Sequence, residues 1–128
     1  MLTVQQQQCF DRDGYVVLDD VLDTAECVRF SERAYQLIAE ADLSNTSRFS
    51  TTNRGEIDRD YFLESAETIR CFFEEQAFDD TGVLAQPRDQ SINKIGHALH
   101  DLDPVFRQLA LRPDLGELAR DLGLIEPD

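Results

Sequence analysis

The segment SINKIGHALHDLDPVF, from Ser91 to Phe106, holds the residues on which the interpretation of this chain depends. It contains Lys94, the only lysine of the 128 residues, and His97 and His100, the only two histidines. Every other cation in the chain is an arginine. The side chains most suited to binding an organic acid or a metal at neutral pH are therefore concentrated in this one segment.

A metal site is one chemistry that this segment suggests. On a helix, His97 and His100 would point to one side, and Asp103 would complete a two-histidine, one-carboxylate set of the kind that binds non-haem iron. Two observations weigh against it. H-x-x-H alone is a weak motif, and Asp103 precedes a proline, which makes its carboxylate the expected N-cap of the next helix. We therefore assign no metal ligand to this segment.

An anion site at Lys94 is the other chemistry, with the histidines serving packing. An ammonium is a compact point charge that suits a carboxylate or a phosphate and, unlike a guanidinium, needs no planar partner. One lysine beside both histidines stands out in a chain whose other cations are all arginine. The alternative is that Lys94 is an ordinary surface cation, and its position in the sequence does not separate the two.

The composition describes a globular chain with a strong acidic bias. Twelve Lys and Arg residues oppose 26 Asp and Glu residues, giving a net charge of −14. Binding to phosphates requires cations that displace counterions, so we expect no nucleic-acid partner and no anionic membrane surface. Solubility accounts for the acidity. The length suits one compact domain.

The cysteines and the first residues indicate the compartment. Cys9, Cys27 and Cys71 are widely spaced and odd in number, which supports neither a zinc site nor a disulfide framework. Residues 1–13 contain four glutamines and no apolar run, so no signal peptide is indicated. No stretch approaches the roughly 20 apolar residues of a membrane helix. We expect a cytoplasmic protein with reduced thiols.

Local signals predict helices in the N-terminal third. Thr3 can cap a helix that runs to about Asp13, where Gly14 supplies a left-handed stop. Asp23 followed by Glu26 is a capping box, so a second helix begins there. The buried stripe of that helix is predicted from residues at three- and four-residue steps: Cys27, Phe30, Ala34, Leu37, Ile38 and Ala41.

Helices are predicted again in the C-terminal third. A short helical turn is expected to carry both histidines. Asp103 followed by Pro104 is an N-cap with proline at the first helical position. Arg112 and Pro113 interrupt this helix, and a last one ends at Gly123. The inner face of the helix after Pro104 is predicted to consist of Val105, Phe106, Leu109 and Ala110.

The middle of the chain is less regular. Residues 44–60 are polar and lack periodicity, which predicts a long loop of the kind that often forms a functional lid, or else plain disorder. Residues 15–18 are β-prone, and residues 69–74 and 91–95 are predicted to be extended. Residues 79–82 form a turn that lets residues 83–84 pair back on the strand before it. A cluster of aromatic residues is expected in the core: Phe62, Phe72, Phe73 and Phe78.

Four stretches, taken in order, resemble the phytanoyl-CoA dioxygenase family, in the branch called phytanoyl-CoA dioxygenase domain-containing proteins. They are FDRDGYVVLDDVLDTAEC from Phe10, DYFLESAETIRCFFEEQAFD from Asp60, SINKIGHALHDLDPVF from Ser91 and LARDLGL from Leu118. The resemblance implies a non-haem Fe(II), 2-oxoglutarate-dependent oxygenase built on a double-stranded β-helix (jelly roll) with helices packed outside. For this chain we expect an α+β fold: a mostly helical N-terminal portion of such a domain with a few short strands.

The resemblance also implies a role for Lys94, namely contact with the 2-oxoglutarate co-substrate from a strand that borders the pocket. It implies iron held by a His-x-Asp pair and a distant third histidine. This chain contains no His-x-Asp, because Ala98-Leu99 follows His97 and Asp101-Leu102 follows His100. We therefore expect residues 1–128 to form a single partial domain, truncated before the iron-binding core, which does not bind iron or turn over alone.

Two function hypotheses follow. In the first, the chain is the N-terminal part of an Fe(II)/2-oxoglutarate-dependent hydroxylase that acts on a small-molecule substrate, with Lys94 positioning the co-substrate. In the second, it is a non-catalytic acidic helical module that binds a partner, either the missing C-terminal half or a second copy. A half-fold would leave apolar faces uncovered, and exposed patches of that kind favour association. These faces are expected around Phe72, Phe73, Phe106 and Leu109.

Overall fold

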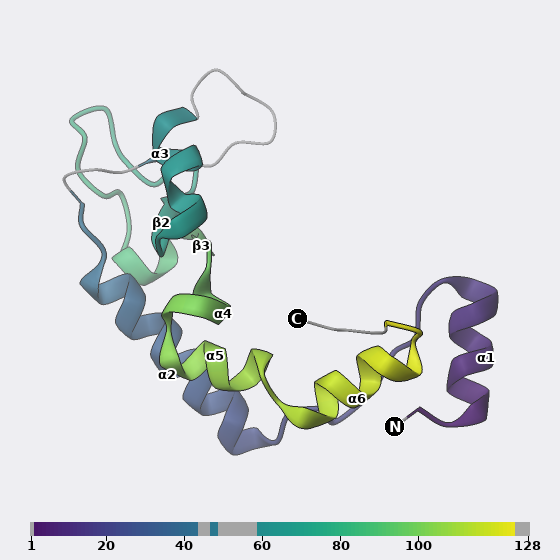
Figure 1. The fold of residues 1–128 in the computed structure, drawn as a ribbon. Helices are drawn as coiled ribbons and strands as arrows, with labels where there is room; N and C mark the ends of the chain where they lie inside the picture. The colour runs from purple at the N-terminus through teal and green to yellow at the C-terminus, as the bar shows by residue number, and fades with distance from the viewer. Residues whose placement is uncertain (1, 44–46, 49–58, 125–128) are drawn as a thin grey trace.

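The computed structural model describes residues 2–43, 47–48 and 59–124. Figure 1 shows a small sheet near one end of the molecule and the helix α1 at the other, with α2, α5 and α6 between them. None of the described helices is both long and apolar enough to span a membrane. The elements, in chain order, are α1 (Val4–Asp13), α2 (Thr24–Glu40), β1 (Ser47–Arg48), α3 (Arg59–Glu64), η1 (Ser65–Glu67), β2 (Arg70–Phe73), η2 (Arg88–Gln90), β3 (Ile92–Gly96), α4 (Leu99–Leu102), α5 (Pro104–Ala110) and α6 (Pro113–Asp121).

The predicted caps of the first two helices are confirmed. Thr3 and Gln6 form a capping box at the start of α1, and Gly14 ends that helix with φ of 79°, a left-handed conformation that costs glycine little. Asp23 and Glu26 form the capping box of α2. In both cases a short sequence pattern satisfies amides that would otherwise lack a partner, so the helix start is decided locally.

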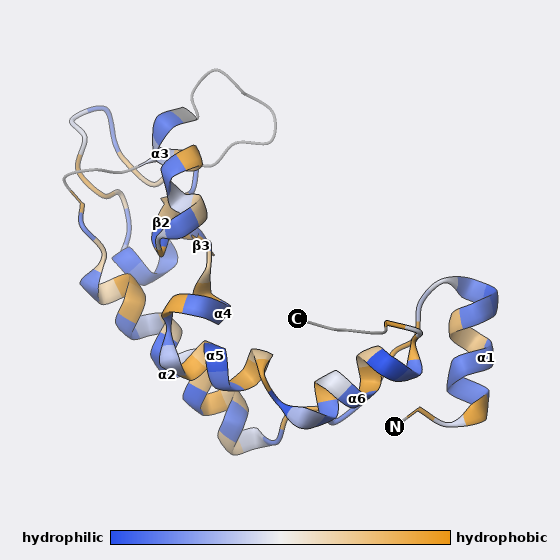
Figure 2. Ribbon diagram, in the orientation of Figure 1, coloured by the Kyte–Doolittle hydropathy of each residue, from blue (hydrophilic) through white to orange (hydrophobic). Residues whose placement is uncertain are grey.

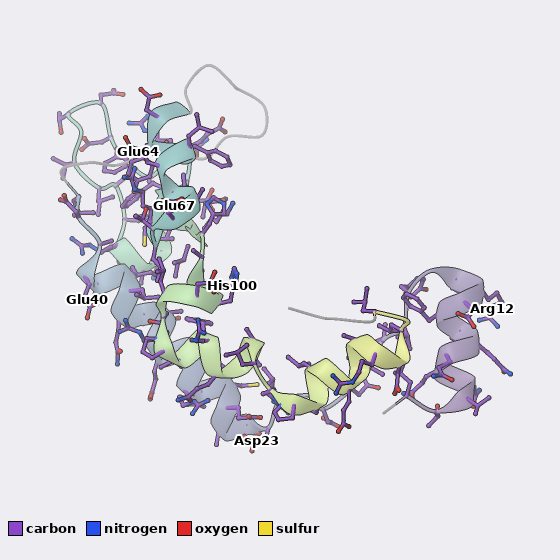
Figure 3. The ribbon with its side chains drawn as sticks, in the orientation of Figure 1. Arg12, Asp23, Glu40, Glu64, Glu67 and His100 are labelled. Atoms are coloured by element: carbon purple, nitrogen blue, oxygen red, sulfur yellow. The ribbon has the colours of Figure 1, made fainter. Side chains whose placement is uncertain are left out.

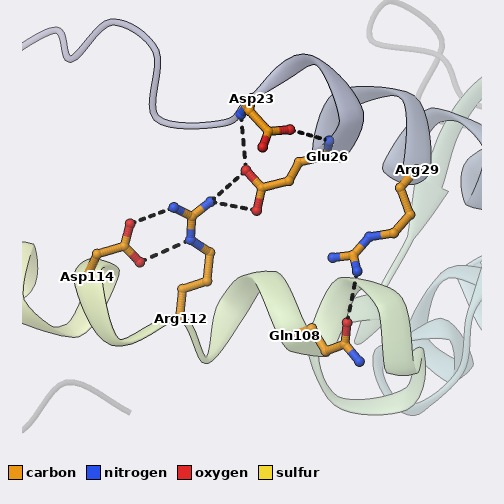
Figure 4. Close-up of polar contacts among 6 residues, drawn as sticks. All are labelled: Asp23, Glu26, Arg29, Gln108, Arg112 and Asp114. Carbon is orange, nitrogen blue, oxygen red and sulfur yellow. Dashed lines mark hydrogen bonds and ion pairs between the residues drawn. The ribbon is translucent and has the colours of Figure 1, made fainter.

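The buried face of α2 differs from the prediction in its first turn. Phe30 and Ile38 are buried, but Cys27 is exposed. Glu26, four residues before Phe30, takes the inward position in that turn, and Arg112 at the start of α6 donates to it at 3.2 Å. Figure 4 shows this contact together with a bond from Arg29 to Gln108 of α5. A polar contact between helices thus takes the place that the apolar pattern assigned to Cys27.

The three strands form one sheet in the order β1-β2-β3. β2 confirms the strand predicted at residues 69–74, and it pairs antiparallel with β3 and parallel with β1. Phe72 and Phe73 of β2 are 0% and 1% exposed and form the centre of the core. The expectation that these two rings lie on an uncovered face is therefore wrong.

Within the polar stretch 44–60, the described residues belong to a strand and a helix. Residues 47–48 form β1, because Ser47 and Arg48 pair with Phe72 and Phe73 of β2. Residue 60 lies within α3. Residues 44–46 and 49–58 lie outside the described residues, and the prediction of a lid or a disordered loop falls mainly on them.

Two segments that were expected to be extended do not join the sheet. Residues 15–18 pair with no strand among the described residues, and Tyr15 and Val17 are exposed. The turn at residues 79–82 is confirmed, since the amide of Gly82 donates to the carbonyl of Asp79. Beyond it, Leu84 pairs with Phe78 in an isolated bridge and not with β2.

Among the helices that follow the sheet, α5 packs against α2. Asp103 caps α5 as predicted, with Pro104 at its first position, and Phe106 of α5 stacks on Phe30 of α2 with ring centroids 5.8 Å apart. Figure 2 shows apolar and polar residues side by side along α2, α5 and α6, the pattern of helices buried on one face only.

Candidate functional site

Lys94 lies in β3, at the middle of the strand and on the side of the sheet that carries Phe72. The two residues are direct cross-strand partners, and such pairs share one face of a sheet. The ammonium nitrogen Nζ lies 5.6 Å from the ring centroids of both Phe62 and Phe72. These distances allow cation–π attraction. The only lysine of the chain is therefore held at the edge of the aromatic core, half-buried.

His97 is the polar neighbour of this lysine. Its Nε2 lies 2.7 Å from Lys94 Nζ, and its Nδ1 lies 2.8 Å from Ser65 Oγ. The ring also contacts Phe62 and Phe72 edge-on, with centroids 5.4 and 5.9 Å apart. The prediction that the histidines serve packing therefore fits His97 in part, because this ring packs and is hydrogen-bonded at both nitrogens.

A glycine makes room for the lysine. A Cβ placed on Gly96 would lie 3.0 Å from Lys94 Cε, closer than most such contacts. Gly96 is itself buried at the end of β3. The absence of a side chain at this position lets the aliphatic part of Lys94 lie against the backbone on its way to His97.

An open pocket of about 440 Å³ lies beside this pair. Lys94, His97 and His100 supply its charged and polar side chains, and α5 supplies part of its apolar wall. A pocket with mostly apolar walls and few polar groups is the usual form of a small-molecule site. The apolar wall consists of side chains from β3, the connection to α4, and α5: Ile95, Leu99, Phe106 and Leu109.

The alternative metal site at His97, His100 and Asp103 is not formed. His97 precedes α4, so the two histidines do not share a helix as expected. His100 is exposed on α4 (Figure 3), with its Nε2 3.3 Å from a carboxylate oxygen of Asp101. Both ring nitrogens of His97 are already hydrogen-bonded. In the part of the chain that the structure describes, no group of three His, Cys, Asp or Glu side chains could hold a metal ion.

Asp103 has a structural role instead. Its Oδ1 accepts from the amides of Val105 and Phe106, and its Oδ2 accepts from Arg33 Nε at 2.6 Å. The side chain is 1% exposed. Burial by itself raises the pKa of the Asp103 carboxyl, but the hydrogen bonds from Arg33 and the two amides outweigh it and hold the pKa below its ordinary value. Asp103 therefore ties α5 to α2.

The sequence interpretation singled out Lys94 and both histidines but missed Ser65 and Phe62 as their neighbours. The sequence predicts Phe62 as a core residue and gives no reason to single out Ser65. Ser65 stands 32 residues before His97, and no local pattern connects the two. An isolated serine on a short helical turn carries no signal that predicts a bond to a distant histidine.

Comparison with known proteins identifies the class. The sequence profile of the family described as phytanoyl-CoA dioxygenase (PhyH) matches residues 10–124. The chain belongs to this family.

Individual relatives agree with that assignment. A phytanoyl-CoA dioxygenase of Arabidopsis thaliana is 41% identical over 98% of this chain and 44% of its own length. Phytanoyl-CoA dioxygenase domain-containing protein 1 of Bos taurus is 42% identical over 98% of this chain and 45% of its own length, and that of Mus musculus is 40% identical over the same shares. The chain thus spans less than half the length of these relatives.

Proposed function

We propose that this chain contributes the co-substrate-binding lysine of an Fe(II)/2-oxoglutarate-dependent hydroxylase of the phytanoyl-CoA dioxygenase family. The chain would be the N-terminal part of a jelly-roll domain, with its three strands at one edge. The observation that carries the proposal is the placement of Lys94, the only lysine, at the rim of an apolar pocket on β3. Membership of the family supports the proposed reaction class.

The chemistry of the pocket suits a carboxylate. An ammonium attracts it, and the half-buried position of Lys94 strengthens the attraction relative to a fully solvated pair. A charge-assisted hydrogen bond of this kind contributes about 1.5–3 kcal/mol. The apolar wall can take the methylene groups of a small keto acid. Lys94 would therefore hold one carboxylate of 2-oxoglutarate.

The described residues do not fit an iron site. His97 is engaged at both nitrogens, His100 lies exposed on α4, and Asp103 is buried against Arg33. We propose that the chain by itself neither holds iron nor turns over. Oxygen consumption by the purified chain with Fe(II) and 2-oxoglutarate would contradict this part of the proposal.

The decisive experiment uses the uniqueness of Lys94. Labelling with ¹³C/¹⁵N-lysine gives one Nζ and one Cε signal to follow during titration with 2-oxoglutarate. We expect saturable shifts with a dissociation constant on the order of 1 mM or weaker for a few contacts. Dimethyl 2-oxoglutarate, which lacks carboxylates, should give no such shift.

A pair of variants separates the lysine from general charge. Lys94→Met should weaken 2-oxoglutarate binding about tenfold or more, from the loss of one charge-assisted contact, when binding is followed on backbone amides. Arg107→Gln removes an exposed cation of α5 and should leave the affinity unchanged. Equal affinity of Lys94→Met and wild type would refute the role of the lysine.

Binding of a partner protein is a second candidate function. The observation that favours it is the half-buried state of Phe106 and Leu109 on α5, beside Leu111, which is 60% exposed. We propose that the occupant of this face is a polypeptide carrying the rest of the family domain. Light scattering of the chain alone and with such a polypeptide tests this. A monomer that forms no complex would argue against it, and self-association of the chain would identify a different partner.

A further inference from the structure

We propose that Ser65 and His97 form a positioning relay that fixes the Lys94 ammonium, with His97 neutral and its proton on Nδ1. The relay rests on the proposed function only for the identity of the ligand that Lys94 receives. Neither Ser65 nor His97 is proposed to touch that ligand. Both act through the lysine.

The direction of the hydrogen bonds determines the tautomer. Ser65 Oγ donates its proton to the carbonyl of Phe62 at 2.6 Å, so toward His97 it can only accept. Nδ1 of His97, 2.8 Å away, must then carry a proton and donate it. Lys94 has donors and no acceptor, so Nε2 of His97 accepts from it at 2.7 Å. The hydrogen bonds therefore run in one direction: Lys94 donates to His97, His97 donates to Ser65, and Ser65 donates to the carbonyl of Phe62.

The parts of the relay are themselves held in place. Ser65 is 0% exposed, and its backbone carbonyl accepts from the amide of His97 at 3.3 Å, so the backbone and the ring of His97 both bond to one residue. The amide of His97 also donates to the carbonyl of Thr68 at 3.1 Å. The rings of Phe62 and Phe72 flank the imidazole edge-on. Rotation of His97 would break several of these contacts at once.

A fixed ammonium binds an anion more tightly than a free one. A lysine side chain has four rotatable bonds, and ordering it at the moment of binding weakens affinity. When His97 holds Nζ beforehand, that ordering has already occurred during folding. The neutral Nδ1–H tautomer is required, because an imidazolium presents a donor and a positive charge to the ammonium.

The tautomer has a direct readout that does not depend on any ligand. The chain has only two histidines, so ¹⁵N-histidine labelling gives two rings, and the exposed His100 is an internal control. At neutral pH we expect His97 to show a protonated Nδ1 and an unprotonated Nε2. Lys94→Met and Ser65→Ala should each shift His97 toward the Nε2–H tautomer, while His100 stays unchanged. An Nε2–H tautomer or an imidazolium at His97 in the wild type would overturn the relay.

Affinity for 2-oxoglutarate tests the consequence with matched variants. His97→Phe keeps an aromatic ring against Phe62 and Phe72 but removes both nitrogens, and should weaken binding about threefold to tenfold, the worth of one hydrogen bond. His97→Gln places an amide oxygen near the position of Nε2 and should restore most of the affinity. Equal affinity in both variants and wild type would refute positioning by His97.

The outcomes separate this inference from the proposed function. If Lys94→Met loses affinity for 2-oxoglutarate and His97→Phe keeps the wild-type affinity, the result supports the Lys94 site and refutes the relay. If Lys94→Met keeps the wild-type affinity for 2-oxoglutarate, the proposed function is refuted. The relay is then tested by the histidine ¹⁵N signals alone. If His97→Phe does not fold, the tautomer measured in the wild type remains decisive.

Discussion

Replacement of Asp103 by asparagine tests the contact that joins α5 to α2. The carboxylate is 1% exposed, caps α5 through two amides and pairs with Arg33. Asparagine is as good an N-cap as aspartate, so Asp103→Asn removes the charge and keeps the cap. Asp103→Ala removes both.

The expected loss of stability follows from the burial of Asp103 and Arg33. Breaking a fully buried ion pair costs about 3–5 kcal/mol. Arg33 is 23% exposed and also reaches Gln36 at 3.0 Å and Glu40 at 4.0 Å, so its charge keeps partners and solvent after the substitution. We therefore expect Asp103→Asn to lower the free energy of unfolding by about 1–3 kcal/mol, and Asp103→Ala by about 1 kcal/mol more.

Urea titration followed by far-ultraviolet circular dichroism measures the effect in a chain that has no tryptophan. A loss of this size lowers the midpoint by about 1 M urea. Asp13→Asn is the control, because Asp13 pairs with Arg12 at an exposed site and should show no measurable change. The reasoning is refuted if Asp103→Asn unfolds at the wild-type midpoint.

The contribution of the Asp103 carboxylate to stability should fall as the pH is lowered. The folded pKa of the Asp103 carboxyl is lowered, so its ionised form is stabilised by folding. This contribution is fully present above the unfolded carboxyl pKa of about 3.9 and is lost as the pH falls through the lower folded value. The stability difference between wild type and Asp103→Asn should therefore be constant near neutral pH and disappear in acid.

Two further predictions concern the core and the lysine. Burial raises the pKa of the Cys71 thiol, whereas Cys27 is exposed. A thiol reagent at mildly alkaline pH should therefore modify Cys27 rapidly and Cys71 only after urea is added. Equal rates of modification would contradict the burial of Cys71. Gly96→Ala should displace Lys94 by a few tenths of an ångström, because the new Cβ meets the flexible end of that side chain, and so change its Cε signal with little effect on the urea midpoint. Gly116→Ala is the control, because a Cβ there has more room, and it should leave the Lys94 Cε signal unchanged. An unchanged Cε signal in Gly96→Ala would show that Lys94 does not lie against the backbone at that position.

The sequence by itself determined the features that depend on neighbouring residues. The starts of α1, α2 and α5 follow from caps in which a side chain satisfies amides two or three residues away. The strand β2 and the aromatic core follow from a run of apolar and aromatic residues. The anion-binding interpretation of Lys94 also came from the sequence, because the rarity of lysine in this chain is visible there.

Only the tertiary structure decided what surrounds that lysine. Ser65 and His97 meet because η1 and the end of β3 lie side by side, and no short-range pattern encodes a contact across 32 residues. The same applies to Glu26, whose pairing with Arg112 joins residues 86 positions apart in a turn where Cys27 is exposed. Local signals specify where elements begin, whereas the partners of a side chain are set by the packing of elements distant in sequence.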